Sequence, residues 1–207
     1  PLCGHDFPSR VLTEERLDEE AVSEFTFSSR KEPDSMRYRM VICSNCDLAY
    51  ANPVLDIAWL RRNYVNASFK SSEESKQAAN DHSRLLDQVL SRLPDRDRAL
   101  DIGAGDGAFI EVLLQREFSN VEGVEPSLEP IRKASSDVKD LIMQGFFHNE
   151  NHDPGSCSIV TCFQTVEHVD NIATLARSVY RILKPGGYFL ISAHNFRAWT
   201  TRLLGSR

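Results

Sequence analysis

The sequence predicts an α/β protein: a parallel β-sheet with helices on both faces, preceded by a small β-rich segment. Two observations support this fold class. From residue 98 onward, apolar runs of strand length alternate with amphipathic helical segments, which is typical of right-handed βαβ crossovers. Before residue 53, short alternating segments and two cysteine-containing turns replace that pattern. A chain of 207 residues can hold one full core together with a small module.

The predicted sheet begins with a strand at residues 98–102, which runs into a glycine-rich turn and then a helix. Gly103, Gly105 and Gly107 allow positive φ angles and let a ligand approach the backbone without a Cβ in the way. From Phe109 onward, apolar residues recur at helical spacing. The turn therefore reads as a cradle for a nucleotide-like cofactor.

The later elements follow the same alternation. We expect helices through Ile131 and Ala134 and through the apolar face that starts at Ile172, and strands at residues 121–125, 141–144, 159–163 and 188–192. In parallel sheets of this kind, ligands bind beyond the carboxyl ends of the strands. The glycine turn and the other motifs described below all lie at such ends.

Two kinds of cofactor are compatible with the glycine-rich turn: a dinucleotide and S-adenosylmethionine. Residues 103–108 also fit the loose dinucleotide fingerprint, but the carboxylate of Asp101 beside the turn would repel a pyrophosphate. An acid at this position suits the ammonium and sulfonium of S-adenosylmethionine better. Glu125 ends the second strand, where a carboxylate accepts hydrogen bonds from both ribose hydroxyls, although this acid alone would fit NAD equally well.

Four segments resemble the class I S-adenosylmethionine-dependent methyltransferases. They are the D-x-G-x-G-x-G motif from Asp101, the acid-ended strand Val121–Ser127, the Glu-His-Val that follows the strand in 159–169, and the L-K-P-G-G turn in 183–191. The resemblance covers about 98 to 193, and Ser158 departs from it where the family has an acid. It implies a Rossmann-like methyltransferase sheet, and we expect its last two strands to be missing from this chain, which stops at Arg207.

The resemblance also implies which residues bind S-adenosylmethionine. One aromatic ring after the third strand is expected to cover the adenine, although such rings are more often simple core. The expected cofactor-binding residues are Asp101, Gly103, Ala104, Gly105, Gly107, Glu125, Pro126, Gly145, Phe146, Gln164 and Thr165.

Glu167 and His168 are the candidate catalytic residues. They follow the fourth strand, beside the expected position of the transferable methyl group, and a histidine titrates in the useful pH range. Alternatively, His168 caps the next helix or covers the cofactor. His194 could face the acceptor or lie in a plain loop, and we expect His148 and His152 at the surface.

A zinc-ribbon-like site is expected near the N-terminus. Cys43 and Cys46 form a C-x-x-C turn, and Cys3 resembles the second half of another, so three thiolates could bind one structural zinc ion. We expect a fourth ligand either from a cysteine directly before Pro1 or from His5. The alternatives are a reduced pair in a turn or a redox motif. Zinc-binding N-terminal segments are common in methyltransferases that act on sugars and other metabolites.

The expected organisation is a zinc-ribbon-like segment at 1–52, a helical linker and lid at 53–97, and the cofactor-binding core at 98–207, incomplete at its C-terminus. In the first segment we expect strands at 22–27, 36–42 and 48–50.

Within the predicted linker, the pattern indicates a short amphipathic helix from Pro53 to Tyr64 and a polar loop over 66–75. A helix that presents Leu85, Leu86 and Val89 on one face then ends at Pro94 and is expected to pack on the sheet.

Composition limits the possible partners. A net charge of −6 and a pI near 5.5 disfavour a broad nucleic-acid surface, and the sequence has neither a membrane-spanning stretch nor a secretory signal, so we expect a cytoplasmic protein. The predicted function is methyl transfer from S-adenosylmethionine to a small metabolite or sugar-linked acceptor. The alternatives are an inactive S-adenosylmethionine-binding module, an RNA methyltransferase and, least favoured, a dehydrogenase.

Overall fold

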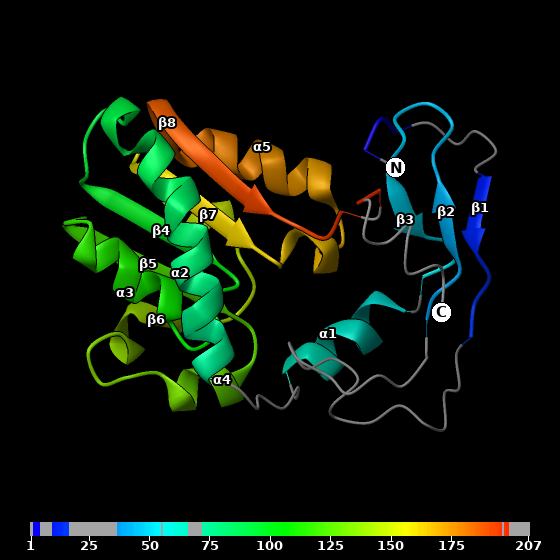
Figure 1. The fold of residues 1–207 in the computed structure, drawn as a ribbon, viewed down its shortest axis with the longest axis horizontal. Coiled ribbons are helices and arrows are strands. Elements are labelled where there is room, and N and C mark those ends of the chain that lie inside the picture. Colours follow the sequence, from blue (N-terminus) through cyan, green and yellow to red (C-terminus); the bar gives the residue numbers. More distant parts are fainter. Residues whose placement is uncertain are drawn as a thin grey trace.

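The computed structural model describes residues 2–4, 10–16, 37–54, 56–65, 72–195 and 197–198. Their largest unit is a five-stranded sheet with the order β6-β5-β4-β7-β8, in which every neighbouring pair is parallel (Figure 1). The predicted parallel α/β fold is therefore confirmed. The strands are β4 (Arg98–Ile102), β5 (Asn120–Glu125), β6 (Ile142–Gln144), β7 (Cys157–Phe163) and β8 (Leu183–Ser192).

The strand order reverses between β4 and β7. The chain steps outward from β4 through β5 to β6, and then returns to place β7 on the other side of β4. Connections on the two sides of such a reversal leave the sheet in opposite directions, so a crevice opens at the carboxyl ends of the two central strands. The glycine turn that follows β4 lies at this crevice.

Helices cover both faces of the sheet and create two separate hydrophobic cores. On one face, α2 (Ser72–Val89) and α3 (Ala108–Gln115) bury Leu86, Ile110 and Leu113. On the other face, α5 (Ile172–Ile182) buries the apolar stripe that its spacing predicted. The short helix α4 is Leu128–Lys133, and single 3₁₀ turns cover Leu90–Arg92, Lys139–Leu141, Asn149–Asn151 and Val166–His168.

A small antiparallel sheet precedes this core, with the order β1-β2-β3. Its strands are β1 (Arg10–Thr13), β2 (Met40–Ile42) and β3 (Ala49–Ala51). The last two agree with the expected strands at 36–42 and 48–50, whereas β1 was not expected. The expected strand at 22–27 lies outside the described residues.

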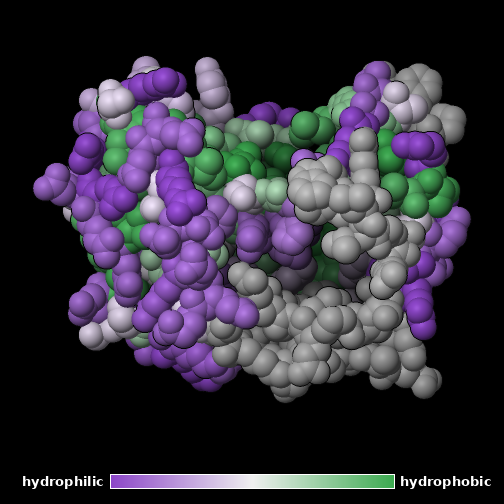
Figure 2. Space-filling view, in the orientation of Figure 1, coloured by the Kyte–Doolittle hydropathy of each residue, from purple (hydrophilic) through white to green (hydrophobic). Residues whose placement is uncertain are grey.

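The segment before the sheet differs in part from expectation. The helix α1 (Ile57–Val65) is close to its predicted position, but α2 begins at Ser72, inside the segment predicted as a loop up to residue 75. Glu73 and Glu74 occupy the first turn of α2, where negative charge stabilises a helix N-terminus. The outward surface of α2 is hydrophilic in Figure 2, as expected for a helix that buries only one face.

The L-K-P-G-G motif interrupts the ladder between β7 and β8 rather than preceding a strand. Cys157 pairs with Leu183 but Ile159 pairs with Tyr188, so the residues between them on β8 bulge out of register. At the same place, the hydroxyl of Ser158 donates to Asp95, whose two carboxylate oxygens each lie 2.9 Å from Nζ of Lys184. Asp95, which precedes β4, thus places a carboxylate beside Ser158 near the start of β7.

None of the helices in the described ranges combines the length and the apolar character that a membrane crossing requires.

The first prediction concerns the packing of α2. Leu86 is fully buried, whereas its neighbour Leu85 is 37% exposed, contrary to the expectation that both lie on the core face. Leu86→Ala should lower the free energy of unfolding by about 2 to 5 kcal/mol because it leaves a cavity against α3. Leu85→Ala is the matched control and should cost less than about 1 kcal/mol. Urea unfolding followed by circular dichroism measures both, and equal losses would contradict this packing.

Candidate cofactor and acceptor site

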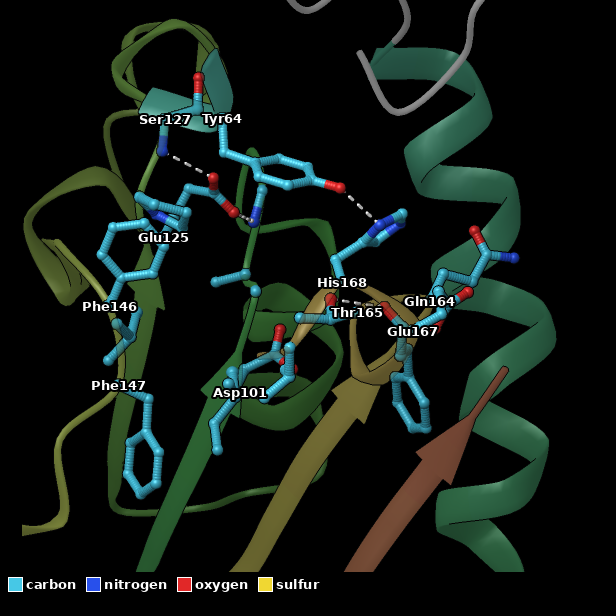
Figure 3. A pocket seen from close by; sticks show the side chains of 18 of the residues that line it. Tyr64, Asp101, Glu125, Ser127, Phe146, Phe147, Gln164, Thr165, Glu167 and His168 are labelled. Carbon is cyan, nitrogen blue, oxygen red and sulfur yellow. Dashed lines mark hydrogen bonds between the residues drawn. The ribbon is translucent and has the colours of Figure 1, made fainter. Parts of the chain in front are cut away.

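A cavity of about 960 Å³ opens at the carboxyl ends of the strands. The turns that follow β4, β5, β6 and β7 line it from the sheet side, and α1 and α2 close it from the other side. Every cofactor-binding and catalytic candidate named from the sequence lies along this cavity except Gly107, which supports the turn from behind. Figure 3 shows the central part of the cavity.

The three glycines of the turn differ in what surrounds them. All three have positive φ angles, of +79° at Gly103, +57° at Gly105 and +78° at Gly107. A Cβ on Gly103 would collide with the side chain of Thr165, and one on Gly107 would lie 2.7 Å from a methyl group of Val138. A Cβ on Gly105 would meet no atom within 4 Å. Gly105 is therefore the glycine that borders open space where a ligand can approach.

Asp101 lies beneath this turn. Its side chain is buried and accepts a hydrogen bond from the hydroxyl of Thr161 over 2.6 Å. Burial raises the pKa of the Asp101 carboxyl to about 6, and the hydrogen bond from Thr161 opposes this shift. The ionised form of such a buried carboxyl is stabilised when a cationic group of a ligand comes close to it.

Glu125 connects the end of β5 to the glycine turn. Its Oε2 accepts a hydrogen bond from the backbone N–H of Gly105 over 3.0 Å, and its Oε1 accepts one from the N–H of Ser127 over 2.8 Å (Figure 3). Burial raises the pKa of the Glu125 carboxyl to about 7, the two backbone hydrogen bonds lower it, and the charge of Asp101 adds to the rise. Each oxygen keeps a further lone pair for a ligand.

The far end of the cavity is formed by the residues after β6. Gly145 has φ +147° and donates its N–H to the carbonyl of Glu125 over 3.0 Å, which directs the chain past the end of β5. The guanidinium of Arg61 lies 5.1 Å from the centre of the Phe146 ring. The ring of Phe146 thus has a cationic group from α1 above it.

His152 does not lie at the surface as expected. It is only 6% exposed, its ring stacks on Phe147 at 5.7 Å, and Nδ1 lies 3.6 Å from a carboxylate oxygen of Glu122. The polar run around it suggested a solvated loop, but the apolar ring of Phe147 covers the imidazole. His148 is exposed, as predicted.

After β7, the chain turns sharply. Gln164 has a left-handed backbone with φ +51°, and its N–H donates to the carbonyl of Ser192 over 2.7 Å. The hydroxyl of Thr165 donates to the carbonyl of Phe163 over 3.0 Å. Such a backbone conformation in a residue other than glycine is costly, and it concentrates at functional sites.

Glu167 and His168 follow in the 3₁₀ turn and face the cavity. Nδ1 of His168 lies 2.7 Å from the hydroxyl of Tyr64, and a carboxylate oxygen of Glu167 lies 3.3 Å from Nδ1 of His194. His168 keeps contact with solvent, but the protein around it lowers its pKa by desolvation. His168 does not cap α5, because the side chain of Asn171 accepts the capping hydrogen bond from Thr174.

Sequence reasoning missed several residues that reach the cavity from the preceding helices and from the segment before β2. The amphipathic pattern of α1 was visible, but a pattern does not say which distant surface a helix will cover. The missed lining residues are Arg37, Tyr38, Trp59, Arg61, Tyr64 and His82.

The three expected metal ligands lie together. The sulfur atoms of Cys3, Cys43 and Cys46 are all within 4.8 Å of one another, and those of Cys3 and Cys43 are 3.6 Å apart. A tight turn holds the pair: the N–H of Asp47 donates to the carbonyl of Cys43 over 3.0 Å, and the N–H of Cys43 donates to the carbonyl of Leu48 over 2.9 Å. This donor set fits zinc, which prefers thiolates. His5 lies outside the described residues.

A family model described as a methyltransferase domain matches residues 74–205, which is more than half of the chain. The chain belongs to the S-adenosylmethionine-dependent methyltransferases. A protein of Pyrococcus horikoshii OT3 shares the fold with a TM-score of 0.53, at 24% identity and with 65% of each chain covered.

Curated relatives are O-methyltransferases of ubiquinone biosynthesis. The one from Sodalis glossinidius (strain morsitans) is 30% identical over 131 residues, covering 58% of this chain and 52% of the relative. The one from Ralstonia nicotianae is 29% identical over 133 residues, covering 58% and 54%. The chain thus spans about half the length of these relatives.

The second prediction is that ligand binding depends on pH through the buried acids. S-Adenosylhomocysteine, the demethylated cofactor, carries the same ribose hydroxyls and ammonium, which favour ionised carboxylates. With the pKa of Glu125 at about 7 in the free protein, binding at pH 6 must displace a proton, so affinity should rise roughly tenfold from pH 6 to pH 8. Titration calorimetry at both pH values measures this rise.

Glu125→Gln is the control for this prediction. It should weaken binding and remove most of the pH dependence, leaving only the smaller contribution of Asp101. Equal or tighter binding by the unsubstituted protein at pH 6 would contradict the assignment.

Proposed function

We propose that this protein transfers a methyl group from S-adenosylmethionine to a small metabolite or sugar-linked acceptor. One observation carries the proposal: a single cavity runs from Phe146 past Glu125 and Asp101 to the Tyr64–His168 pair. The cavity thus connects the proposed nucleoside site, at Phe146 and Glu125, with the titratable side chain of His168. The names of the curated relatives favour an oxygen atom as the methyl acceptor.

The geometry of the cavity supports the proposed cofactor residues. Glu125 would accept the ribose hydroxyls through its free lone pairs, Phe146 would cover the adenine, and Asp101 would attract the ammonium. When bound, S-adenosylmethionine supplies an electrophilic methyl group. Gly105 leaves the necessary space beside the backbone.

For an oxygen acceptor, the proposed base is His168. Its Nε2 would take the hydroxyl proton as the acceptor oxygen bonds to the methyl carbon, and the electrons of the broken carbon–sulfur bond stay on sulfur. Tyr64 would hold the imidazole through Nδ1. Burial raises the pKa of Tyr64 to about 12, so the phenol stays neutral and its oxygen can accept the Nδ1 hydrogen. Nε2 is then left with a free lone pair.

The third prediction tests turnover. Incubation with S-adenosylmethionine and a panel of hydroxylated small molecules and nucleotide-linked sugars should produce S-adenosylhomocysteine, detected by mass spectrometry. His168→Gln should lower kcat by about 100-fold because it removes the base, while leaving cofactor affinity within about twofold. Tyr64→Phe should lower kcat less and shift the pH profile.

Two outcomes would count against the proposal. Cofactor binding without product from any acceptor would indicate an inactive binding module. Product formed only with RNA, in a salt-sensitive manner, would indicate an RNA methyltransferase.

We further propose that Cys3, Cys43 and Cys46 bind a structural zinc ion. The support is the convergence of three sulfur atoms from segments 40 residues apart in the chain. The backbone N–H of Asn45, which lies 3.4 Å from the sulfur of Cys43, would stabilise a thiolate there. The fourth ligand is proposed to be His5 or a cysteine preceding Pro1.

The fourth prediction concerns this metal. Elemental analysis of the purified protein should find about one zinc ion per chain, and Cys43→Ser should abolish it. Chelation should then expose residues 1–52 to proteolysis without releasing cofactor, because the energy of zinc binding stabilises the small sheet. Cys157→Ser, at a buried cysteine of the large sheet, is the control and should keep the metal. A protein without zinc would leave these cysteines as a reduced turn.

A further inference from the structure

The cavity has a direction that is set by the strand order. Glu125 lies at the end of β5, and Phe146 follows β6 on its outer side. A nucleoside whose ribose binds Glu125 and whose base lies at Phe146 must therefore extend its remaining part toward β4 and β7. On the proposed function, that remaining part is the amino-acid end of S-adenosylmethionine, which carries an ammonium and a carboxylate.

Two buried acidic side chains line the cavity at the end where this carboxylate would lie. Asp101 and Asp106 are both buried at the glycine turn. They suit the ammonium but repel a carboxylate. The protein must therefore offer this carboxylate a separate hydrogen-bond donor or positive charge.

The glycine turn does not supply that donor. The N–H groups of Gly103 and Ala104 donate to the carbonyl of Val124, over 2.8 and 3.1 Å, and the N–H of Gly107 donates to the carbonyl of Ala104 over 2.9 Å. The N–H of Gly105 donates to Glu125. These four backbone donors are therefore already in use.

Several neighbouring side chains are also engaged. The hydroxyl of Thr165 donates to the carbonyl of Phe163. Both arginines of the cavity wall have other partners: Arg61 binds Asp170 through two nitrogen atoms, and Nε of Arg37 donates to the carbonyl of Glu14.

His82 lies at the required place. It belongs to α2, borders the cavity, and stacks on the ring of Phe163, the last residue of β7, at 4.3 Å and 17°. Phe109 in turn packs edge-on against Phe163 at 4.7 Å. The imidazole is thus held over the β7 end of the cavity, and an imidazole always carries at least one N–H donor. Among the described residues, no hydrogen bond uses its ring nitrogens.

We infer that His82 binds the carboxylate at the amino-acid end of the cofactor. The aromatic stack fixes the ring, and the N–H group provides the donor that the glycine turn lacks. A carboxylate bound there would also favour the protonated imidazole, giving a charge-assisted hydrogen bond. His82 is then a binding residue that acts together with Asp101 on the two charged groups of one ligand end.

The test compares two ligands that differ only at this end. S-Adenosylhomocysteine has the amino-acid group, whereas 5′-methylthioadenosine keeps the adenine, ribose and sulfur but has a methyl group in its place. His82→Phe keeps an aromatic ring for stacking but removes both nitrogen atoms. We expect it to weaken S-adenosylhomocysteine binding about tenfold or more, with 5′-methylthioadenosine changed less than twofold, in titration calorimetry.

Two further variants complete the design. His82→Gln restores a neutral N–H donor and should recover part of the lost affinity, which also covers the case in which His82→Phe folds poorly. His148→Phe changes another histidine of the cavity wall, beyond Phe147, and should leave the ratio of the two affinities unchanged.

Each result has a distinct meaning. Unchanged S-adenosylhomocysteine binding by His82→Phe, or an equal loss for both ligands, would overturn the assignment of His82 while leaving the proposed cofactor intact. Failure of the unsubstituted protein to bind either ligand would overturn the proposed function and this inference together.

Discussion

The hydrogen bonds from the N–H groups of Gly105 and Ser127 to the carboxylate of Glu125 hold the site together. They join the turn after β4 to the turn after β5 through one buried side chain, in addition to the backbone hydrogen bonds from Gly103 and Ala104 to Val124. Burial disfavours the ionised form of the Glu125 carboxylate, and the charge of Asp101 disfavours it further. Two buried acids at neighbouring strand ends cost stability in the free protein. A ligand with hydroxyl and ammonium groups would relieve that cost, and the free energy released would add to the affinity for the ligand.

The second half of the cavity depends on segments that precede the sheet. No residue of α1 is fully buried, although Trp59, Leu60 and Tyr64 are half-buried. Two polar contacts tie this helix to the large sheet: Arg61 pairs with Asp170, and Tyr64 contacts His168, across more than 100 residues of sequence. Both partners lie after β7. The acceptor side of the cavity is therefore assembled only when α1 contacts the turn that carries Glu167 and His168.

The small N-terminal sheet is also close to this site. Arg37 and Tyr38, which directly precede β2, border the cavity, and β2 leads into the turn with Cys43. Arg197, beyond β8, reaches back to Asp47 with its guanidinium 3.3 Å from the carboxylate. A metal ion at the cysteine cluster would thus stabilise a segment that forms part of the cavity wall.

The sequence by itself determined the large sheet and the glycine cradle. Strand and helix periods, positive-φ glycines and the acids at strand ends are local signals, so Asp101, Gly105 and Glu125 could be located without coordinates. The burial of His152 could not be located in this way, because it depends on how the segment between β6 and β7 packs His152 against Phe147 and Glu122. Only the tertiary structure decided that Tyr64, Arg61 and His82 border the cavity. Their neighbours are distant in sequence, and an amphipathic pattern shows that a helix has an inner face without showing which surface that face meets.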